Sequence, residues 1–354
     1  WGDSAVWNPY SMYLFYGDKQ ILENQYFTAK KWVDYMLRCS KEHNPRYESE
    51  PQYHTITDGE LDANYIYDTR MHFGEWMEPI PKDYGGKTLE QVFYDLIKSG
   101  RPLVATAYMK RSCENLAHIA EILGKSDECT YYRKKADRIA AVYEKYLIDE
   151  KGVIEKGHQA AYVRALAFGL CKDKKRLVEA QLVKEIESNG YKLNTGFLST
   201  PFLLPVLVNI EREDLAFKLL LNTDNPSWLH PILLGATTIP ESWDGFDKFY
   251  NSFNHYSYGA VSEFLFGYVG GIRPVFNGAG FEKFLLKPII GSLRYARAEY
   301  NSLYGKIVSE WKKENEKLLY QCTVPVNTQA ELTLPNGEKH IIGSGNYSFS
   351  ISLT

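Results

Sequence analysis

The chain contains little cysteine and lacks the motifs of metal and nucleotide sites. Its 354 residues include five cysteines, an odd number without Cys-x-x-Cys spacing, which argues against a zinc site and a dense disulfide framework. The eight histidines are not spaced as metal-ligand pairs, and no nucleophile elbow, phosphate-binding loop or dinucleotide fingerprint occurs. The sequence therefore predicts buried free thiols and implies neither a metal nor an organic cofactor.

Long apolar runs and an excess of one charge are also missing. No apolar run could span a bilayer, and Trp1-Gly-Asp has neither part of a signal peptide. The 41 basic and 44 acidic residues give a formal charge of −3, without the basic field of a nucleic-acid binder or a polybasic membrane anchor. We expect neither nucleic acid nor a membrane as partner. Because no Met precedes Trp1, we expect the chain to begin inside a longer gene product, which leaves cytoplasm and periplasm open.

Helical periodicity fills most of the chain. From Val6 to about Gly270 apolar residues recur mostly at three- and four-residue spacing, which predicts a helical domain over residues 1–272. The two long joining segments, His43–Gly86 and Asn222–Asn254, are expected to carry function. The predicted helices, which pair into hairpins, are Ile21–Leu37, Leu89–Lys98, Pro102–Gly124, Ser126–Tyr146, Gln159–Leu170, Leu177–Ser188, Pro201–Asn209, Asp214–Leu221 and Tyr256–Val269.

The period changes near Gly270-Gly271. Beyond Phe284 it approaches two, in segments bounded by Pro, Asn and Gly, which predicts strands. Pro335-Asn336-Gly337 is a hairpin signal that asks for positive φ at its central residues. The sequence thus predicts a small antiparallel β-sandwich over residues 273–354. Its strands are expected at 295–300, 306–312, 318–324 and 330–334.

Two neighbouring segments concentrate the chemistry of the chain. Ala236–Gly245 and Asn251–Gly259 gather carboxylates, an indole, an imidazole and amides into a predicted loop and helix start. Sugar-cleaving sites need such a mixture, because acids move protons while flat rings pack against the apolar faces of a pyranose. An acidic loop followed by a helix cap is the alternative. The aromatic content of 14% fits sugar-stacking surfaces, but it also fits a plain aromatic core, to which we assign most of the tyrosines.

Further motifs occur in one order along the chain. They are Trp1-Gly-Asp-Ser-Ala-Val-Trp-Asn-Pro-Tyr, Tyr16-Gly-Asp, Trp32-Val-Asp-Tyr, Phe73-Gly-Glu-Trp-Met, Asn194-Thr-Gly-Phe-Leu-Ser-Thr-Pro and Pro226-Ser-Trp. Together with the two segments above, this order resembles the C-terminal part of the inverting α-L-rhamnosidases of glycoside hydrolase family seventy-eight. The resemblance runs from Trp1 to about Pro325.

The resemblance implies an (α/α)6-type helical barrel followed by the family's C-terminal β-sandwich. The sequence supports fewer helices than the twelve of the family's barrel. The family also places a helix pair and several β domains before the Trp-Gly-Asp motif. We therefore expect the barrel to be N-terminally truncated in this chain, with the missing N-terminal part of the same protein as a possible partner.

Glu241 is the candidate general base. An inverting glycosidase needs a carboxylic acid for the leaving oxygen and a carboxylate that activates water, ~6.5–9.5 Å apart. Glu241 matches the family's base, and Pro240 restricts the backbone before it. A solvated loop glutamate is the alternative reading.

Asp3, Glu75 and Trp76 are candidate sugar-binding residues. Asp3 matches a family aspartate that binds sugar hydroxyls, although an N-cap for a helix starting near Ala5 would explain it equally. Glu75 stands where the family most often has Asp, so its carboxylate is displaced by one methylene. Trp76 could be a stacking platform or part of the core.

Three further candidates lie around Glu241 in the sequence. His255 matches a family histidine of the sugar pocket, and its alternative is a helix cap or a buried hydrogen-bonded group. Trp228 and Trp243 are expected to shape the pocket wall. Asp244 could orient one of them or cap the next turn.

The implied activity is hydrolysis of terminal α-L-rhamnosyl residues in a rhamnose-containing oligosaccharide or glycoside. The family's general acid precedes the Trp-Gly-Asp motif and is absent here, so the isolated chain is expected to be inactive or weakly active. The alternatives are another (α/α)-barrel glycoside hydrolase or phosphorylase, and a non-catalytic sugar-binding protein. A pH profile with two carboxylate limbs would favour hydrolysis, and binding without turnover would favour the last reading.

Overall fold

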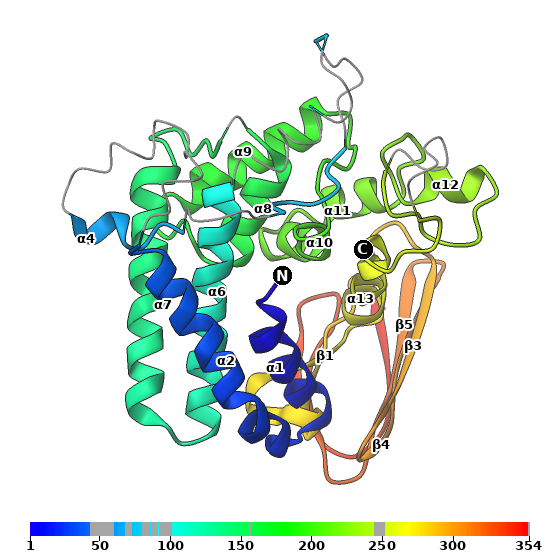
Figure 1. Ribbon diagram of the computed structural model, residues 1–354. Coiled ribbons are helices and arrows are strands. Elements are labelled where there is room, and N and C mark those ends of the chain that lie inside the picture. The colour runs from blue at the N-terminus through cyan, green and yellow to red at the C-terminus, as the bar shows by residue number, and fades with distance from the viewer. Residues whose placement is uncertain are drawn as a thin grey trace. The chain divides into compact units, whose positions relative to one another are not determined.

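The structure divides the chain into two compact units. The computed structural model describes residues 1–42, 60–67, 73–79, 85–86, 91, 101–155, 157–243 and 252–352. Unit 1 comprises Trp1–Trp7 and Tyr26–Gly259, and unit 2 comprises Asn8–Gln25 and Ala260–Thr354. Unit 1 is helical and unit 2 carries the strands (Figure 1). The predicted succession of a helical part and a β-sandwich is confirmed.

Most predicted helices are present within a few residues of their expected bounds. None of the helices in the described ranges has the length and apolar character that a membrane span requires. The expected helix Leu89–Lys98 lies outside the described residues. The helices are α1 (Ser4–Tyr16), α2 (Lys19–Cys39), α4 (Glu60–Ala63), α6 (Arg101–Ile122), α7 (Ser126–Leu147), α8 (Gln159–Ala167), α9 (Lys175–Ser188), α10 (Thr200–Asn209), α11 (Glu213–Leu220) and α12 (Leu229–Leu233).

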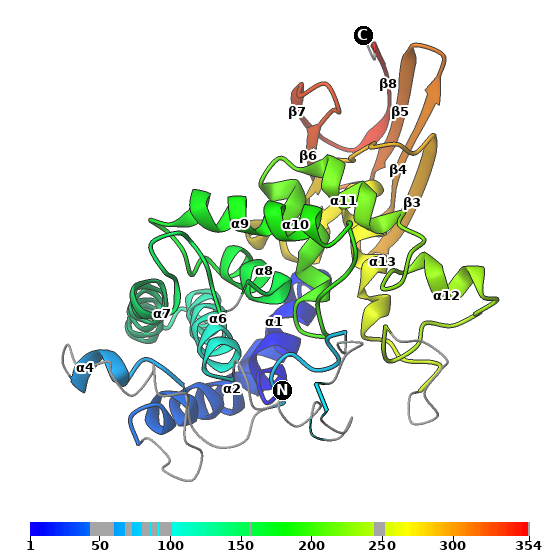
Figure 2. The ribbon, with the colours of Figure 1, turned by 90° about the horizontal axis from the view of Figure 1, so that it is seen from above.

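Helices α6 and α7 form an antiparallel hairpin in unit 1, visible side-on in Figure 1 and end-on in Figure 2. Gly124 ends α6 with a φ of 73°, and the N–H of Lys125 donates to the carbonyl of Ala120 at 2.8 Å, the bond of a Schellman cap. Asp127 and Glu128 in the first turn of α7 suit its dipole. These local signals explain why the sequence predicted the hairpin. Helix α8 packs against α9 and α10, and α10 against α11.

The first turn of α1 is fixed in unit 1 by Trp7. Its indole stacks on Tyr108 at 5.2 Å between ring centroids and meets Phe168 and Phe202 edge-on. The indole N–H donates to the hydroxyl of Ser112 at 3.2 Å. The cluster joins α1 to α6, α8 and α10, so the Trp1–Asp3 segment has a fixed place in the helical core.

Unit 2 contains two four-stranded sheets. Burial alternates along β5, where Leu318, Tyr320 and Cys322 face inward. Trp311 on β4 is fully buried, and its indole donates to the carbonyl of Val269 at 2.8 Å. The sheet orders are β1-β2-β6-β7 and β3-β4-β5-β8. The strands are β1 (Ile272–Pro274), β2 (Lys283–Leu286), β3 (Tyr295–Ser302), β4 (Gly305–Glu314), β5 (Lys317–Val324), β6 (Gln329–Thr333), β7 (Lys339–Ile342) and β8 (Gly345–Ser352).

The sandwich differs from the prediction in two details. Strands β2 and β6 pair in parallel, because the three strands β3 to β5 of the other sheet lie between them in sequence and reverse the chain before it returns. In the β6–β7 hairpin the N–H of Gly337 donates to the carbonyl of Leu334 at 2.8 Å. Pro335 and Asn336 are then the central residues, and the positive φ, 89°, falls on Gly337 after them. This is a turn with a following glycine bulge.

The predicted helix Tyr256–Val269 is broken into short pieces. A 3₁₀ turn at Tyr258–Ala260 precedes α13 (Val261–Phe264) and a π-helical turn at Leu265–Val269. The N–H of Gly270 donates to the carbonyl of Leu265 at 2.8 Å. A Cβ on Gly270 would lie 2.5 Å from that of Ala298, so tertiary packing determines how this segment ends.

Candidate active site

A cavity of about 270 Å³ opens beside the start of the chain in unit 1. Its walls are largely aromatic, and Asp3 is the charged side chain among the described residues that line it. The lining residues are Trp1, Gly2, Asp3, Trp32, Tyr35, Met36, Tyr67, Phe73, Gly74, Val104, Ala105, Tyr108 and Leu198. One carboxylate among flat rings is suited to binding a sugar by its hydroxyls and apolar faces.

Asp3 is held by side chains of α2 and α6. Its Oδ1 accepts hydrogen bonds from the hydroxyl of Ser112 at 2.7 Å and the indole of Trp32 at 3.3 Å. The first bonds of α1 use the carbonyl of Asp3, and the described side-chain bonds go to these partners and to the amino group of Trp1. The carboxylate is therefore oriented from two sides at the cavity wall.

Glu75 is buried against Arg164 of α8. Its Oε2 pairs with the guanidinium and accepts from the hydroxyl of Ser199 at 2.7 Å, while Oε1 accepts from the backbone N–H of Ser199 at 2.7 Å. Burial lowers the pKa of Arg164 and the Glu75 carboxylate raises it, with a net shift upward. Glu75 is absent from the described lining of the cavity, and its contacts tie the 73–79 segment to α8 and α10.

Trp76 lies directly against the turn before α10. Its carbonyl accepts the N–H of Phe197 at 2.8 Å, and its ring meets Phe73 edge-on at 5.3 Å. A Cβ on Gly196 would fall 2.2 Å from that carbonyl, so only glycine allows the two segments to approach this closely. The half-buried Trp76 thus takes part in the core packing and borders the cavity residue Phe73.

Glu241 and His255 lie on two chain segments that run alongside each other. The N–H of Glu241 donates to the carbonyl of Ser252 at 2.9 Å, and that of His255 to the carbonyl of Ile239 at 2.8 Å. Oε2 of Glu241 accepts the N–H of Ser252 at 3.0 Å. Nδ1 of His255 lies 3.2 Å from the N–H of Ser257 and accepts from it, which leaves Nε2 of the neutral ring as the donor. Asp244 lies outside the described residues.

Trp228 and Trp243 form a buried support beneath this loop. The indole of Trp228 donates to the carbonyl of Tyr258 at 3.0 Å, and that of Trp243 to the carbonyl of Thr195 at 2.7 Å. Trp243 also stacks on Tyr258 at 3.8 Å. The hollow beside them measures only about 20 Å³, room for about one water. Both indoles border this small hollow together with Ile239 and Pro240.

Ring contacts connect the Asp3 cavity to the Glu241 loop. Phe197 contacts Trp1 at 6.3 Å on one side and stacks on His255 at 4.9 Å on the other. The structure therefore brings together Trp1–Asp3, the 194–199 turn and the paired 239–241 and 252–255 segments. The sequence motifs did not single out Phe197, Arg164 and Tyr258 as members of this group. The Phe197 position was signalled only by the Asn194 motif, and a buried arginine on α8 had no sequence signal.

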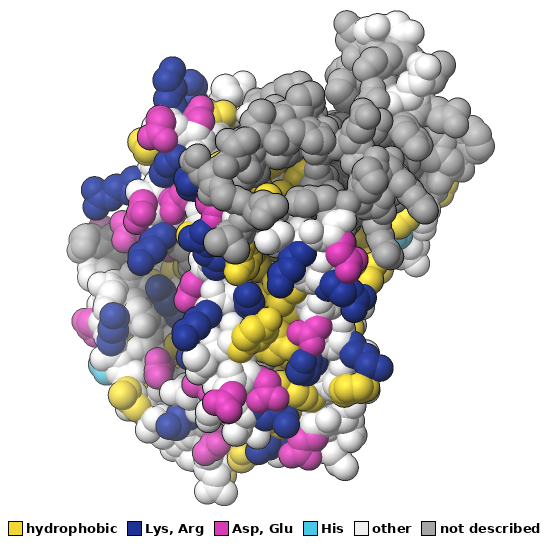
Figure 3. Space-filling model, turned by 60° about the vertical axis from the view of Figure 1, so that its left-hand side comes forward, with side chains coloured by type: hydrophobic (Ala, Val, Ile, Leu, Met, Phe, Trp, Pro, Cys, Tyr) yellow, Lys and Arg dark blue, Asp and Glu magenta, His cyan; other side chains and the backbone are white. Residues whose placement is uncertain are grey.

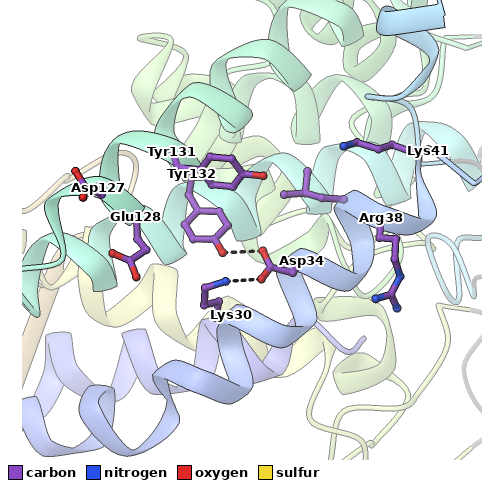
Figure 4. Close-up of a pocket in the computed structure, with 9 residues that line it drawn as sticks. Lys30, Asp34, Arg38, Lys41, Asp127, Glu128, Tyr131 and Tyr132 are labelled. Carbon is purple, nitrogen blue, oxygen red and sulfur yellow. Dashed lines mark hydrogen bonds and ion pairs between the residues drawn. The ribbon is translucent and has the colours of Figure 1, made fainter.

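A second hollow of about 650 Å³ lies between α2 and α7 and holds none of the predicted site residues (Figure 4). There Asp34 accepts from the hydroxyl of Tyr132 at 2.7 Å and from the ammonium of Lys30 at 2.6 Å. The negative charge of the Asp34 carboxylate is therefore balanced by Lys30. On the described part of the face in Figure 3, acidic and basic side chains are intermingled around apolar ones, so no field of one sign marks it as a binding surface.

The helical-hairpin unit and the β-sandwich define the class of protein. Residues 1–269 match the bacterial α-L-rhamnosidase 6 hairpin glycosidase domain, and residues 271–349 match the bacterial α-L-rhamnosidase C-terminal domain. The chain therefore has a six-hairpin glycosidase fold. It belongs to the bacterial α-L-rhamnosidase family.

Individual relatives agree with this assignment. An α-L-rhamnosidase of Formosa agariphila is 31% identical over 99% of this chain and 35% of its own length. The crystal structure of a Streptomyces avermitilis α-L-rhamnosidase complexed with L-rhamnose matches with a TM-score of 0.83 and 27% identity, over 99% of this chain and 33% of that one. A native Aspergillus terreus enzyme gives the same TM-score and identity, over 39% of its length. This chain spans about a third of the length of these relatives.

Proposed function

We propose that this chain forms part of the catalytic site of an enzyme that hydrolyses terminal α-L-rhamnosyl residues with inversion. Glu241 would be the general base, with the general acid supplied from outside this chain. Asp3, Glu75 and His255 would contact sugar hydroxyls, and Trp76, Trp228 and Trp243 would shape the pocket. The supporting observation is the Phe197 stack, which connects the Asp3 cavity to the paired segments that carry Glu241 and His255.

The proposed reaction is a single displacement. Glu241 takes a proton from water, the water oxygen bonds to the anomeric carbon, and the glycosidic bond breaks as the acid protonates the leaving oxygen. Ser252 donates to Oε2 of Glu241 at 3.0 Å, and no hydrogen bond from the described residues reaches Oε1, which leaves it for the water. The Nε2–H of His255 supplies a donor for a hydroxyl.

The test compares Glu241→Gln with wild type in the full-length protein on p-nitrophenyl α-L-rhamnoside. p-Nitrophenolate leaves with little acid assistance, so the assay isolates the base. We expect a loss of ~10²–10⁴-fold in kcat, with wild type releasing inverted rhamnose by NMR. Glu316→Gln, at an exposed position in unit 2, is the matched control. Retention of activity in Glu241→Gln would remove Glu241 from the mechanism. Initial release of α-rhamnose, the anomer of the substrate, would exclude inversion.

We also propose that the 354-residue chain alone is inactive or weakly active. Without an acid, substrates with poor leaving groups should react ~10²–10⁴-fold more slowly than with the full-length protein. Equal rates of natural rhamnoside hydrolysis by the two polypeptides would contradict this.

A further inference from the structure

Tyr256 is exposed and yet held in a defined orientation. Its side chain is 81% exposed, although burying an aromatic ring is ordinarily favourable. The ring lies nearly parallel to the imidazole of His255, with centroids 5.1 Å apart and an interplanar angle of 16°. His255 therefore lies alongside the ring, and most of the Tyr256 side chain remains accessible to a ligand.

The backbone on both sides of Tyr256 is anchored. On one side the N–H of His255 is bonded to Ile239, and on the other the N–H of Ser257 is bonded to the His255 ring. The next residue, Tyr258, is buried and stacked on Trp243. Because both flanks are anchored, the backbone that carries the ring needs no further ordering when a ligand binds, which is the advantage of a preorganised contact.

The stack of rings leads outward from the candidate sugar pocket. Phe197 is 8% exposed and stacks on His255 at 4.9 Å, and His255 in turn stacks on Tyr256. Exposure rises along this series to the ring of Tyr256. In an enzyme that removes a terminal sugar, the leaving group projects from the pocket toward solvent, the direction in which this series runs.

We propose that Tyr256 is the stacking platform for the leaving group, and that the site selects rhamnosides whose first group beyond the cleaved bond is a flat ring. The inference rests on the proposed function, because that function makes His255 a sugar contact. The shared chemistry is one flat, weakly polar ring face, supplied either by an aromatic aglycone or by the apolar face of the next pyranose. Such a face stacks on a tyrosine ring, and the tyrosine hydroxyl remains available to ring substituents.

The experiment measures binding and turnover with three ligands in the full-length protein. They are methyl α-L-rhamnoside, which has no ring to stack, p-nitrophenyl α-L-rhamnoside, and a disaccharide with rhamnose at its non-reducing end. Binding is measured by calorimetry in a Glu241→Gln background, so that no substrate is consumed. Tyr256→Ala removes the platform, and Tyr256→Phe keeps the ring while removing the hydroxyl.

In the Glu241→Gln background, we expect Tyr256→Ala to weaken binding of a ring-bearing ligand by roughly two- to tenfold. In the protein that retains Glu241, the same substitution should lower kcat/KM for that ligand by a similar factor. Methyl α-L-rhamnoside should be unaffected, and Tyr256→Phe should match wild type. A loss confined to the aryl glycoside assigns the platform to aromatic aglycones, and one confined to the disaccharide assigns it to a second sugar. An equal loss for all three ligands, or none, overturns the proposal.

Failure of the proposed function gives a different result. Binding is therefore also measured for the methyl and p-nitrophenyl glycosides of other sugars. If rhamnosides do not bind but another aryl glycoside gains affinity through Tyr256, the platform stands and the sugar assignment is wrong. If no glycoside binds, both proposals fall.

Discussion

At the scale of single residues, Glu75 shows most clearly what the sequence could not reveal. Its motif predicts a sugar contact, while the structure surrounds it with Arg164 and Ser199. Arg164 is 89 residues away in the sequence, and nothing in the local pattern of α8 marks it as a partner. The motifs did locate Asp3, Glu241 and His255 on segments that the structure brings together, and their roles stay predictions.

Replacing Glu75 tests how much its buried pair with Arg164 contributes to the stability of the fold. Glu75→Gln leaves the guanidinium of Arg164, which is 2% exposed, without its charge partner, and breaking a buried pair in this way costs about 3–5 kcal/mol. Urea unfolding should show this loss. Glu121→Gln breaks a half-exposed pair with Arg133 and should cost under about 1 kcal/mol. Unchanged stability in Glu75→Gln together with lost rhamnoside binding would make Glu75 a sugar contact alone.

Gly196 gives a second residue-scale prediction. A methyl group there would meet the carbonyl of Trp76 at 2.2 Å, so Gly196→Ala must push the 194–199 turn away from the 73–79 segment. We expect a destabilisation of about 1–3 kcal/mol and weaker binding of methyl α-L-rhamnoside, because Phe197 moves with the turn. Gly343→Ala has open space around its Cβ and should leave thermal unfolding unchanged. A neutral Gly196→Ala would show that the two segments separate without strain.

At the scale of elements, the sequence predicted those helices and strands that are stabilised by bonds between residues close in the chain. The α6–α7 hairpin and strands β3 to β6 follow from periodicity, caps and turn residues. The break in Tyr256–Val269 and the parallel β2–β6 pair do not, because they arise from contacts such as Gly270 with Ala298 and from the route of the chain between sheets. Short strands such as β1 and β7 carry too few residues to show a period.

The start of α8 gives a prediction for pH. His158 precedes the helix, and its Nδ1 lies 3.6 Å from Oε1 of Glu78. A hydrogen bond to Glu78 raises the pKa of His158 above its ordinary value of 6.5, against the effect of burial. A raised folded-state pKa gives stability that is full below 6.5 and is lost as pH rises through the folded value.

His158→Gln should therefore destabilise the protein more at about pH 5.5 than at about pH 8.5, measured as shifts in the urea midpoint. His118 on α6 provides a control of opposite sign, because burial lowers its pKa and its contribution is lost as pH falls. His118→Gln should therefore destabilise the protein less at about pH 5.5 than at about pH 8.5. A pH-independent effect of His158→Gln would mean that the His158–Glu78 contact does not form in solution.

At the scale of the whole molecule, all five cysteines are buried and free, as the sequence predicted. Burial raises the pKa of Cys171 and Cys322 to about 12, so little of either thiol is ionised near neutral pH, and the thiolate is the reactive form. We expect almost no reaction with a disulfide reagent in the native protein and five reactive thiols in urea. A thiol that reacts rapidly before unfolding would show that one of these sites is open.

Unit 2 combines the β-strands with a helical segment from much earlier in the chain. The residues Asn8–Gln25 belong to it although they precede the β-strands by most of the chain. Phe15 packs against the buried Phe281, and a Cβ on Gly280 would lie only 3.1 Å from the backbone nitrogen of Gly17. A gene segment that begins at the first strand would encode a sandwich without this helical strap. A polypeptide cut at that boundary therefore carries an incomplete unit.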